Sequence, residues 1–337
     1  MAAPRTRLVS HRSALGHWEI LLREPHPSLR AHVRGRYEGF FESEASFARR
    51  LEVPFPGVVL IVNFGAAWGM VDRDHPTRPP EKRDSFVAGL HDGYSLVEST
   101  GVSCCVQVNL TPLGARRLFG LPMHELANRT VALEDALGPA ARPLAERLGE
   151  LRRRARSAWP AESSRRAPSA WPAESSRRAR SAWPAESSRR ARSAWPAESS
   201  VWESRFALLD SFLAARLARG LEPSSAVAFA WERLAEKAGL VEIGALAAEL
   251  GWSRKRLIAE FRDDIGLPPK TLARIFRFHR AVERLAGAEG ARFAELAHEC
   301  GYYDQAHMNR DFREFAGSTP SEFLRRRLPD RGGVVGD

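Results

Sequence analysis

One pattern occurs twice near the end of the chain, and it constrains the fold more than any other feature of the sequence. The first copy is V-E-I-G-A-L-A-A-E-L-G-W-S-R-K-R-L-I-A-E-F, from Val241 to Phe261, and the second is F-A-E-L-A-H-E-C-G-Y-Y-D-Q-A-H-M-N-R-D-F, from Phe293 to Phe312. Each copy begins with apolar residues at i, i+3, i+4 and i+7, the spacing of a short helix with one buried face. The copies start about 50 residues apart and form an internal repeat of one supersecondary unit.

Each copy also carries the signals of a turn between two helices. The first helix ends at Gly251 or Gly301, and glycine can adopt the left-handed backbone that such a turn needs. Ser253 and Asp304 follow, and both residue types are favoured at helix N-caps. A second helix with an apolar face begins after each cap, so each copy predicts a helix-turn-helix unit.

A longer helix is predicted between the two units. Pro268-Pro269-Lys270 marks its start, since proline is tolerated in a first helical turn, and an apolar stripe continues from Leu272 to Leu285. One rigid helix fixes the distance between the units, and two recognition helices about 34 Å apart can enter successive major grooves on one face of a duplex. The sequence therefore predicts an all-α domain over residues 240–328 that binds double-stranded DNA.

The residues of both units follow longer motifs. The first unit contains L-A-x-x-x-G-x-S-x-x-x-L-x-x-x-F, from Leu246 to Phe261, and the second contains A-x-x-C-G-Y-x-D-Q-x-H-x-x-R-x-F, from Ala297 to Phe312. The sequence G-x-T-P-x-x-F follows, from Gly317 to Phe323. In these motifs the chain resembles the AraC/XylS family of transcriptional regulators. The resemblance implies a sequence-specific DNA-binding regulator of transcription and not an enzyme.

Polar and basic side chains at the start of each second helix are the candidate DNA contacts. Ser253 and the backbone amides at these helix starts are predicted to contact phosphates, which positions the protein without reading bases. Glutamine suits adenine and arginine suits guanine in the major groove. The predicted readers are Arg254, Lys255 and Arg256 in the first groove, and Gln305, His307, Asn309 and Arg310 in the second.

The net charge of +10 does not by itself support DNA binding by this domain. Residues 152–200 hold 12 Arg and 4 Glu, which supply +8 of that charge, whereas the chain from Leu240 onward holds 16 basic and 15 acidic residues. The prediction of a DNA-binding domain therefore rests on where the basic residues lie, because acidic residues on other faces cancel the sum without cancelling the local field.

The N-terminal part, residues 1–151, has the composition of a β-rich domain. Short runs rich in Val, Phe, Tyr and Ile are bounded by turn residues and predict a small, mainly antiparallel sheet or barrel. The predicted strands are His32 to Phe41, Val58 to Phe64, Ser85 to Gly89, Tyr94 to Glu98, and Val102 to Leu110. This part is similar to the cupin-like sensor domains that precede the same DNA-binding unit in bacterial regulators, which implies control by a small-molecule effector. The expected fold class is α+β.

The N-terminal part shows no residue pattern for catalysis. His75, His91 and His124 are far apart and form no H-x-H pair, so no metal, cofactor or catalytic residue is predicted. Cys104 and Cys105 lie on a predicted strand, where at least one thiol faces the core. The alternative function is a small-molecule enzyme or repair module fused to the DNA-binding unit.

The middle of the chain repeats the unit R-S-A-W-P-A-E-S-S-R-R-A with a period of 12 residues. A 12-residue unit with one Trp-Pro and no apolar periodicity cannot form a packed layer. Residues 152–200 are therefore predicted to be a disordered linker. A second interpretation is a basic, tryptophan-bearing tether that holds phosphates or single strands without sequence preference. On that basis the whole protein could instead be a non-specific nucleoid binder.

Two further segments complete the predicted organisation. Residues 201–239 contain two amphipathic helices, Val201 to Arg219 and Ser224 to Ala238, which form either a connector or dimer surface or pack on the sensor. Residues 329–337 are predicted to be a flexible tail. The sequence has no apolar run of 18 residues and no apolar signal core at its start, so we expect no membrane contact and a cytoplasmic, nucleoid-associated protein. A homodimer is left open.

Overall fold

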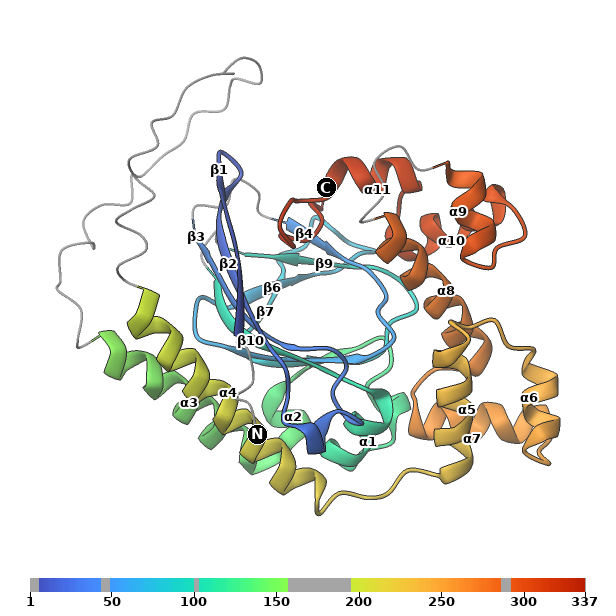
Figure 1. Ribbon diagram of the computed structural model, residues 1–337, viewed down its shortest axis with the longest axis horizontal. Coiled ribbons are helices and arrows are strands. Elements are labelled where there is room, and N and C mark those ends of the chain that lie inside the picture. The colour runs from blue at the N-terminus through green and yellow to red at the C-terminus, as the bar shows by residue number, and fades with distance from the viewer. Residues whose placement is uncertain (1–5, 44–48, 100–102, 157–194, 286–291, 337) are drawn as a thin grey trace.

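The chain folds into a β-rich N-terminal part and a helical C-terminal part (Figure 1). The computed structural model describes residues 6–43, 49–99, 103–156, 195–285 and 292–336. Strands occupy the chain up to Ala132, and helices account for most of the remainder, so the predicted α+β class is confirmed. Most of the 12-residue repeats lie outside the described residues. Within the described residues no helix is both long enough and apolar enough to span a membrane.

The strands form two antiparallel sheets. The larger sheet has the order β1-β2-β3-β10-β5-β8-β11, and the smaller has the order β4-β9-β6-β7. The strands of the larger sheet are β1 (Thr6–Ser13), β2 (Gly16–Arg23), β3 (Tyr37–Ser43), β5 (Val58–Asn63), β8 (Phe86–Ala88), β10 (Ser103–Leu110) and β11 (Thr130–Ala132). Those of the smaller sheet are β4 (Arg49–Glu52), β6 (Trp68–Val71), β7 (Glu81–Arg83) and β9 (Ser95–Glu98).

The two faces of the larger sheet are both covered. Cys104 and Cys105 are adjacent on β10 and both buried, each in a different apolar cluster, because successive strand residues point to opposite faces. The Cys105 cluster includes Trp68 and Met70 of β6, so it lies between the two sheets. The Cys104 cluster lies on the other face, under the helices.

Four helices cover the outer face of the larger sheet. They are α1 (Pro112–Phe119), α2 (Leu133–Leu137), α3 (Ala141–Arg156) and α4 (Trp195–Leu217). Short 3-10 turns lie between β2 and β3 (Pro27–Leu29), between α1 and β11 (Met123–Glu125), and between α2 and α3 (Gly138–Ala140). Helices α3 and α4 lie side by side along one flank of the β-structure (Figure 1). Apolar residues of α4 are fully buried in the same cluster as the sheet, namely Phe206, Leu209 and Leu213.

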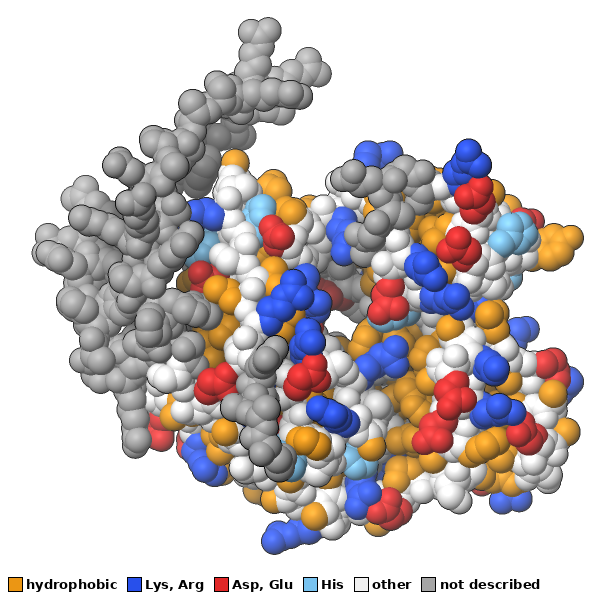
Figure 2. Space-filling model, in the orientation of Figure 1, with side chains coloured by type: hydrophobic (Ala, Val, Ile, Leu, Met, Phe, Trp, Pro, Cys, Tyr) orange, Lys and Arg blue, Asp and Glu red, His pale blue; other side chains and the backbone are white. Residues whose placement is uncertain are grey.

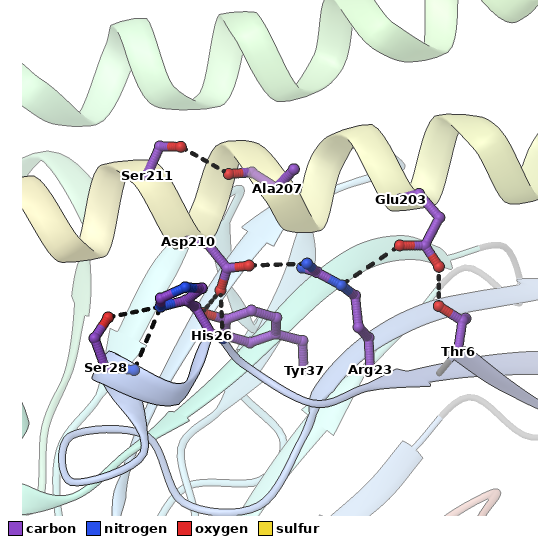
Figure 3. Close-up of polar contacts among 9 residues, drawn as sticks. All are labelled: Thr6, Arg23, His26, Ser28, Tyr37, Glu203, Ala207, Asp210 and Ser211. Atoms are coloured by element: carbon purple, nitrogen blue, oxygen red, sulfur yellow. Dashed lines mark hydrogen bonds and ion pairs between the residues drawn. The ribbon is translucent and has the colours of Figure 1, made fainter. Parts of the chain in front are cut away.

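A buried polar network anchors α4 to the sheet (Figure 3). The Arg23 guanidinium is 6% exposed and lies 2.9 Å from Asp210 of α4 and 3.4 Å from Glu203. The Tyr37 hydroxyl donates to Asp210 at 2.9 Å, and burial followed by the Asp210 charge raises the pKa of that hydroxyl. The Arg23 guanidinium and the Tyr37 hydroxyl thus each pair with a carboxylate of α4 across the α4–sheet contact.

The predicted connector over residues 201–239 is divided between the two parts of the chain. Helix α4 begins at Trp195, inside the last repeat, and belongs to the N-terminal core, where its apolar residues from Trp202 onward are buried. Helix α5 (Ser225–Glu236) packs instead with the C-terminal helices through Val227, Ala230 and Trp231. Packing decided this outcome, since each helix buries its apolar face against the nearer core.

The segment predicted to be a flexible tail makes defined contacts with the N-terminal part. Residues 329–336 turn back onto the N-terminal part, where Leu51 donates its backbone N–H to Val334 at 2.9 Å. The Arg50 side chain, 5% exposed, donates to the carbonyl of Gly332 at 3.1 Å. The backbone of this segment thus hydrogen-bonds to β4, an edge strand of the smaller sheet.

Candidate DNA-binding surface

Two helix-turn-helix units lie at opposite ends of one helix, α8 (Figure 1). The first unit is α6 (Ile243–Glu249) and α7 (Arg254–Asp264), and the second is α9 (Phe293–Glu299) and α10 (Gln305–Ala316). Helix α8 spans Pro269–Leu285, and α11 (Pro320–Arg326) closes the domain. The predicted repeat of one supersecondary unit and the helix between its copies are therefore confirmed.

The turns of both units are built as the sequence predicts. Gly251 and Gly301 have φ angles of +65° and +80°, which is the left-handed region that favours glycine. The Ser253 hydroxyl accepts from the backbone N–H of Arg256 at 3.2 Å, and the Asp304 carboxylate accepts from that of His307 at 2.7 Å. These caps satisfy the free amides at the starts of α7 and α10, which fixes where each recognition helix begins.

A shared apolar core holds the six helices together with α5. Leu257 and Phe261 of α7 and Met308 and Phe312 of α10 are fully buried in this core, as predicted from their spacing. The inward side of each recognition helix is thus committed to packing. Its outward side is free to face a ligand.

An ion pair fixes α10 against α8. Arg274 of α8 lies 2.7 Å from Asp311, which is 1% exposed, and donates to Glu314 at 2.9 Å and 2.5 Å. Its guanidinium also lies over the Phe315 ring, 4.8 Å from the centroid. The hydrogen bonds from Arg274 lower the pKa of Glu314. Because a bidentate guanidinium fork has a fixed geometry, this contact sets the orientation of the second recognition helix.

The outward face of α7 is basic at its start. Arg254, Lys255 and Arg256 are all exposed, and Ser253 precedes them at the cap. The Arg254 guanidinium lies 3.7 Å from Glu242, and that of Arg256 lies over the Trp252 ring at 4.4 Å. Arg254 and Glu242 are both exposed, and surface ion pairs contribute little, so a phosphate can replace Glu242 at small cost.

The outward face of α10 carries fewer of the predicted readers than the sequence indicated. Gln305 and Arg310 are exposed, whereas His307 and Asn309 are only half-exposed. The His307 ring packs edge-on against Tyr302, 5.2 Å between centroids, and the Asn309 Oδ1 atom is buried. Helical spacing turns these two side chains toward the flanks of the helix, beside the buried row that includes Met308.

Two exposed apolar residues beside the recognition helices were not predicted as DNA contacts. Tyr303 is 84% exposed in the turn just before α10, and Ile258 is 37% exposed on the outward face of α7. An exposed aromatic ring and an aliphatic side chain are groups that contact the thymine methyl or a sugar. For Tyr303, the sequence signal that could have identified it is its position next to the Asp304 cap.

Acidic and basic side chains alternate over the C-terminal helices, as Figure 2 shows in one view. Among the predicted contacts, the basic residues are Arg254, Lys255 and Arg256 at the start of α7, and Arg310 in the second turn of α10. In the part of the chain that the structure describes, no group of three His, Cys, Asp or Glu side chains is placed to hold a metal ion.

Two segments of the chain match known protein families. Residues 246–326 match a family described as a helix-turn-helix domain, and residues 23–132 match a domain of unknown function, DUF6597. No curated protein matches the chain.

Several solved structures are similar in part. ToxT from Vibrio cholerae is 11% identical over 86% of this chain and 98% of ToxT, with a TM-score of 0.43. A structure of ToxT with an unsaturated fatty acid bound is 11% identical over 87% of this chain and 96% of ToxT, with a TM-score of 0.42. The C-terminal domain of AraT, a response regulator from Geobacillus stearothermophilus, is 20% identical over 34% of this chain and 97% of that domain, with a TM-score of 0.30. At these TM-scores, none of the three bears on what this chain binds.

The C-terminal part carries two capped recognition helices at the two ends of one rigid helix, and a β-rich part precedes it in the chain. This arrangement defines a DNA-binding regulator of transcription. Within that class, the matched residues 246–326 and the paired units make the C-terminal part an AraC-type helix-turn-helix domain. The resemblance drawn from the motifs of the sequence is confirmed.

Proposed function

We propose that α7 and α10 enter successive major grooves on one face of a DNA duplex. The observation that supports this proposal is the pair of outward helix faces, basic or polar at their starts, at the two ends of α8. Helix α8 has 17 residues and is therefore about 25 Å long. Adding half the width of a recognition helix at each end gives a centre-to-centre separation of about 35 Å, which is close to one DNA turn of about 34 Å.

Each predicted contact has a distinct role in this proposal. Ser253 and the capped amides hold phosphates, and Arg254, Lys255 and Arg256 enter the first groove. Gln305 and Arg310 are the principal readers of the second groove, because both are exposed. His307 and Asn309 contribute through the edges that remain accessible at the flanks of α10.

Selection of binding sites from random duplex DNA tests the proposal. At about 150 mM salt, binding through phosphates alone is weak, so enriched sequences report base reading. A site with two elements about one helical turn apart is the expected result. A motif from a single groove, or no enrichment at all, would contradict the two-groove arrangement.

We propose further that the N-terminal part senses a small molecule and that the protein acts either alone or as a homodimer. The support for a sensor is the attachment of a separate β-rich core to the DNA-binding helices through α4, α5 and the C-terminal tail. Sedimentation velocity of the full chain, with and without its DNA site, distinguishes one bound copy from two.

A further inference from the structure

A cleft of about 590 Å³ lies where α1, α3 and α4 meet. Its lining includes residues at the end of α4. Figure 1 shows that the chain leaves the N-terminal part for α5 at this end. Small-molecule sites in proteins commonly enclose between about 300 and 1,000 Å³. Leu118, Phe119, Leu208 and Phe212 supply apolar side chains to its walls. The size and the apolar lining suit the body of a small organic molecule.

The charged residues of the cleft all have the same sign. Arg117, Arg147, Arg216 and Arg219 line it, and no Asp or Glu is among the described residues that do so. A concave site lined by one sign of charge focuses its field and attracts the opposite ion. Because guanidinium groups pair with planar anions through two parallel hydrogen bonds, carboxylate, sulfonate and phosphate groups fit this lining.

Two of the four arginines hold the walls of the cleft together. The Nε atom of Arg216 donates to the carbonyl of Leu118 at 3.0 Å, and the Nε atom of Arg117 donates to that of Leu217 at 2.6 Å. These bonds join α1 to the end of α4. Arg117 and Arg216 are accordingly half-buried and positioned by the fold.

The other two arginines are available for a ligand. Arg147 on α3 and Arg219 after α4 are exposed, and within the described ranges neither side chain has a hydrogen bond or an ion pair. Two unpaired cations beside an apolar wall have no role in holding the local fold. An anionic ligand would give both of them a partner.

The cleft also touches the segment that joins the two parts of the chain. Gly220 and Leu221 line it, and the next residue, Glu222, lies 2.6 Å from the Arg117 guanidinium. A Cβ atom on Gly220 would lie 2.1 Å from the carbonyl oxygen of Arg117, so the linker passes directly against α1. A movement of Arg117 therefore displaces the linker through its contacts with Gly220 and Glu222.

The same linker continues to the first recognition helix. The backbone N–H of Ser224 donates to Asp264 at the end of α7, 2.9 Å away. Arg116, the neighbour of Arg117 on α1, donates to Asp264 at 3.2 Å and to Asp263 at 3.1 Å. Adjacent arginines on α1 thus connect the cleft on one side with the recognition helix on the other.

We propose that this cleft binds an amphipathic organic anion, and that the bound anion displaces Glu222 from Arg117 and so shifts the linker that leads to α7. The anionic group pairs with Arg147 and Arg219 and competes with Glu222 for Arg117, which lines the same cleft. The apolar body packs on Phe212 and Leu208. The proposed binding site is inferred from the geometry of the cleft alone. Its effect on DNA binding rests on the proposed function given above.

Binding of the fluorescent anion 8-anilinonaphthalene-1-sulfonate to the full chain tests the site. The expected result is saturable binding that weakens as salt is raised, because its sulfonate pairs with arginines. N-phenyl-1-naphthylamine has a similar aromatic body without the charge, and we expect it to bind at least about tenfold more weakly. Equal affinity for the two dyes would overturn the assignment, since it would mean that apolar surface alone accounts for binding.

Matched variants locate that binding. The double variant Arg147→Gln/Arg219→Gln is expected to lose at least about tenfold in sulfonate affinity. The control double variant Arg30→Gln/Arg142→Gln removes the same charge from exposed positions outside the cleft. We expect this control to change the sulfonate affinity little. Equal losses in the two double variants would contradict the site. Urea unfolding of each variant shows that the fold is retained, and the two-dye comparison on the unaltered chain applies whatever the variants do.

The link to the DNA-binding part is tested with Glu222→Gln. Removal of the carboxylate that pairs with Arg117 is expected to raise sulfonate affinity about threefold. It is also expected to change the affinity for the selected DNA site in the same direction as binding of the dye changes it. An unchanged dye affinity would refute competition with Glu222. If the chain selects no DNA site, the proposed regulation of DNA binding fails while the dye results still decide the cleft; if the dyes fail, site selection is unaffected.

Discussion

Arg310 lies on the outward face of α10, one turn after Ala306 and well clear of the packed core. Arg310→Ala is expected to weaken binding to the selected site by about 1–3 kcal/mol if the guanidinium makes a bidentate contact with guanine. The measurement is a titration of labelled duplexes that carry the selected site or a scrambled one. Arg325→Ala, on α11, removes the same charge and serves as the control. Equal weakening on both duplexes would instead make Arg310 a phosphate contact.

Arg274 has a different role, since it binds protein rather than DNA. Arg274→Met leaves the Asp311 carboxylate buried without its cation, which is expected to cost about 3 kcal/mol of the free energy of unfolding. Urea denaturation measures the loss, and affinity for the selected site should fall toward that for a scrambled duplex, because the orientation of the base-reading helix α10 is lost. Adding Asp311→Asn to this variant removes the buried charge and should restore part of the stability. A double variant no more stable than Arg274→Met would contradict this account.

At the scale of elements, the C-terminal tail forms a second connection between the two parts of the chain. Trp18, which is fully buried, donates its indole N–H to the carbonyl of Asp330 at 3.2 Å, and Val334 is 8% exposed. Deletion of residues 329–337 is expected to cost about 2–3 kcal/mol, from lost apolar burial and unpaired backbone groups. Urea denaturation of the shortened chain gives the value.

A point variant separates the tail's backbone contacts from its surface charge. The Arg331 side chain lies 2.8 Å from Glu38, and the arginine is 53% exposed, so Arg331→Ala should cost well under about 1 kcal/mol. If the shortened chain unfolded at the same urea concentration as the full one, the tail would contribute no stability and its contacts would be incidental.

The elements that could be predicted from the sequence are those specified by nearby residues. The helices of both helix-turn-helix units were predicted because apolar spacing, a glycine and a cap occur within about 20 residues of one another. The five predicted strand ranges each contain a strand, but six others were missed: β1, β2, β4, β6, β7 and β11. Several of these have only three or four residues, and β1 is polar and exposed along much of its length, so they show no apolar alternation.

The contacts that position the candidate site could not be predicted, because they join distant parts of the chain. Arg274 and Asp311 are 37 residues apart, and Arg116 and Asp264 are 148 apart. Periodicity describes one face of one element and carries no information about which charge it meets. For the same reason His307 and Asn309 were assigned an outward position that the packing around Tyr302 gives them only in part.

At the scale of the whole molecule, the two parts of the chain meet at a titratable contact. His279 of α8 packs edge-on against Phe55 of the N-terminal part, 5.3 Å between ring centroids. The Arg34 guanidinium lies over the rings of both Phe55 and Phe276, which places a fixed cation beside the histidine. Burial, and then the Arg34 charge, lowers the pKa of His279 from 6.5 to about 4, and exposed Glu283, 3.6 Å away, does not offset this.

Acid is therefore expected to weaken this contact. The unfolded chain takes up a proton at His279 near pH 6.5 while the folded chain does so only near pH 4, so the unfolded state binds more protons between these values. The contribution of His279 to stability is unchanged above about pH 6.5 and falls as the pH is lowered toward 4, by about 3 kcal/mol in total. Urea unfolding at about pH 7.5 and about pH 5 measures this fall. His279→Gln, which cannot take up the proton, should make the dependence shallower, whereas His75→Gln at an exposed position should leave it unchanged. The same slope in the unaltered chain and in His279→Gln would mean that other groups govern acid stability and that the contact between the two parts is not sensitive to pH.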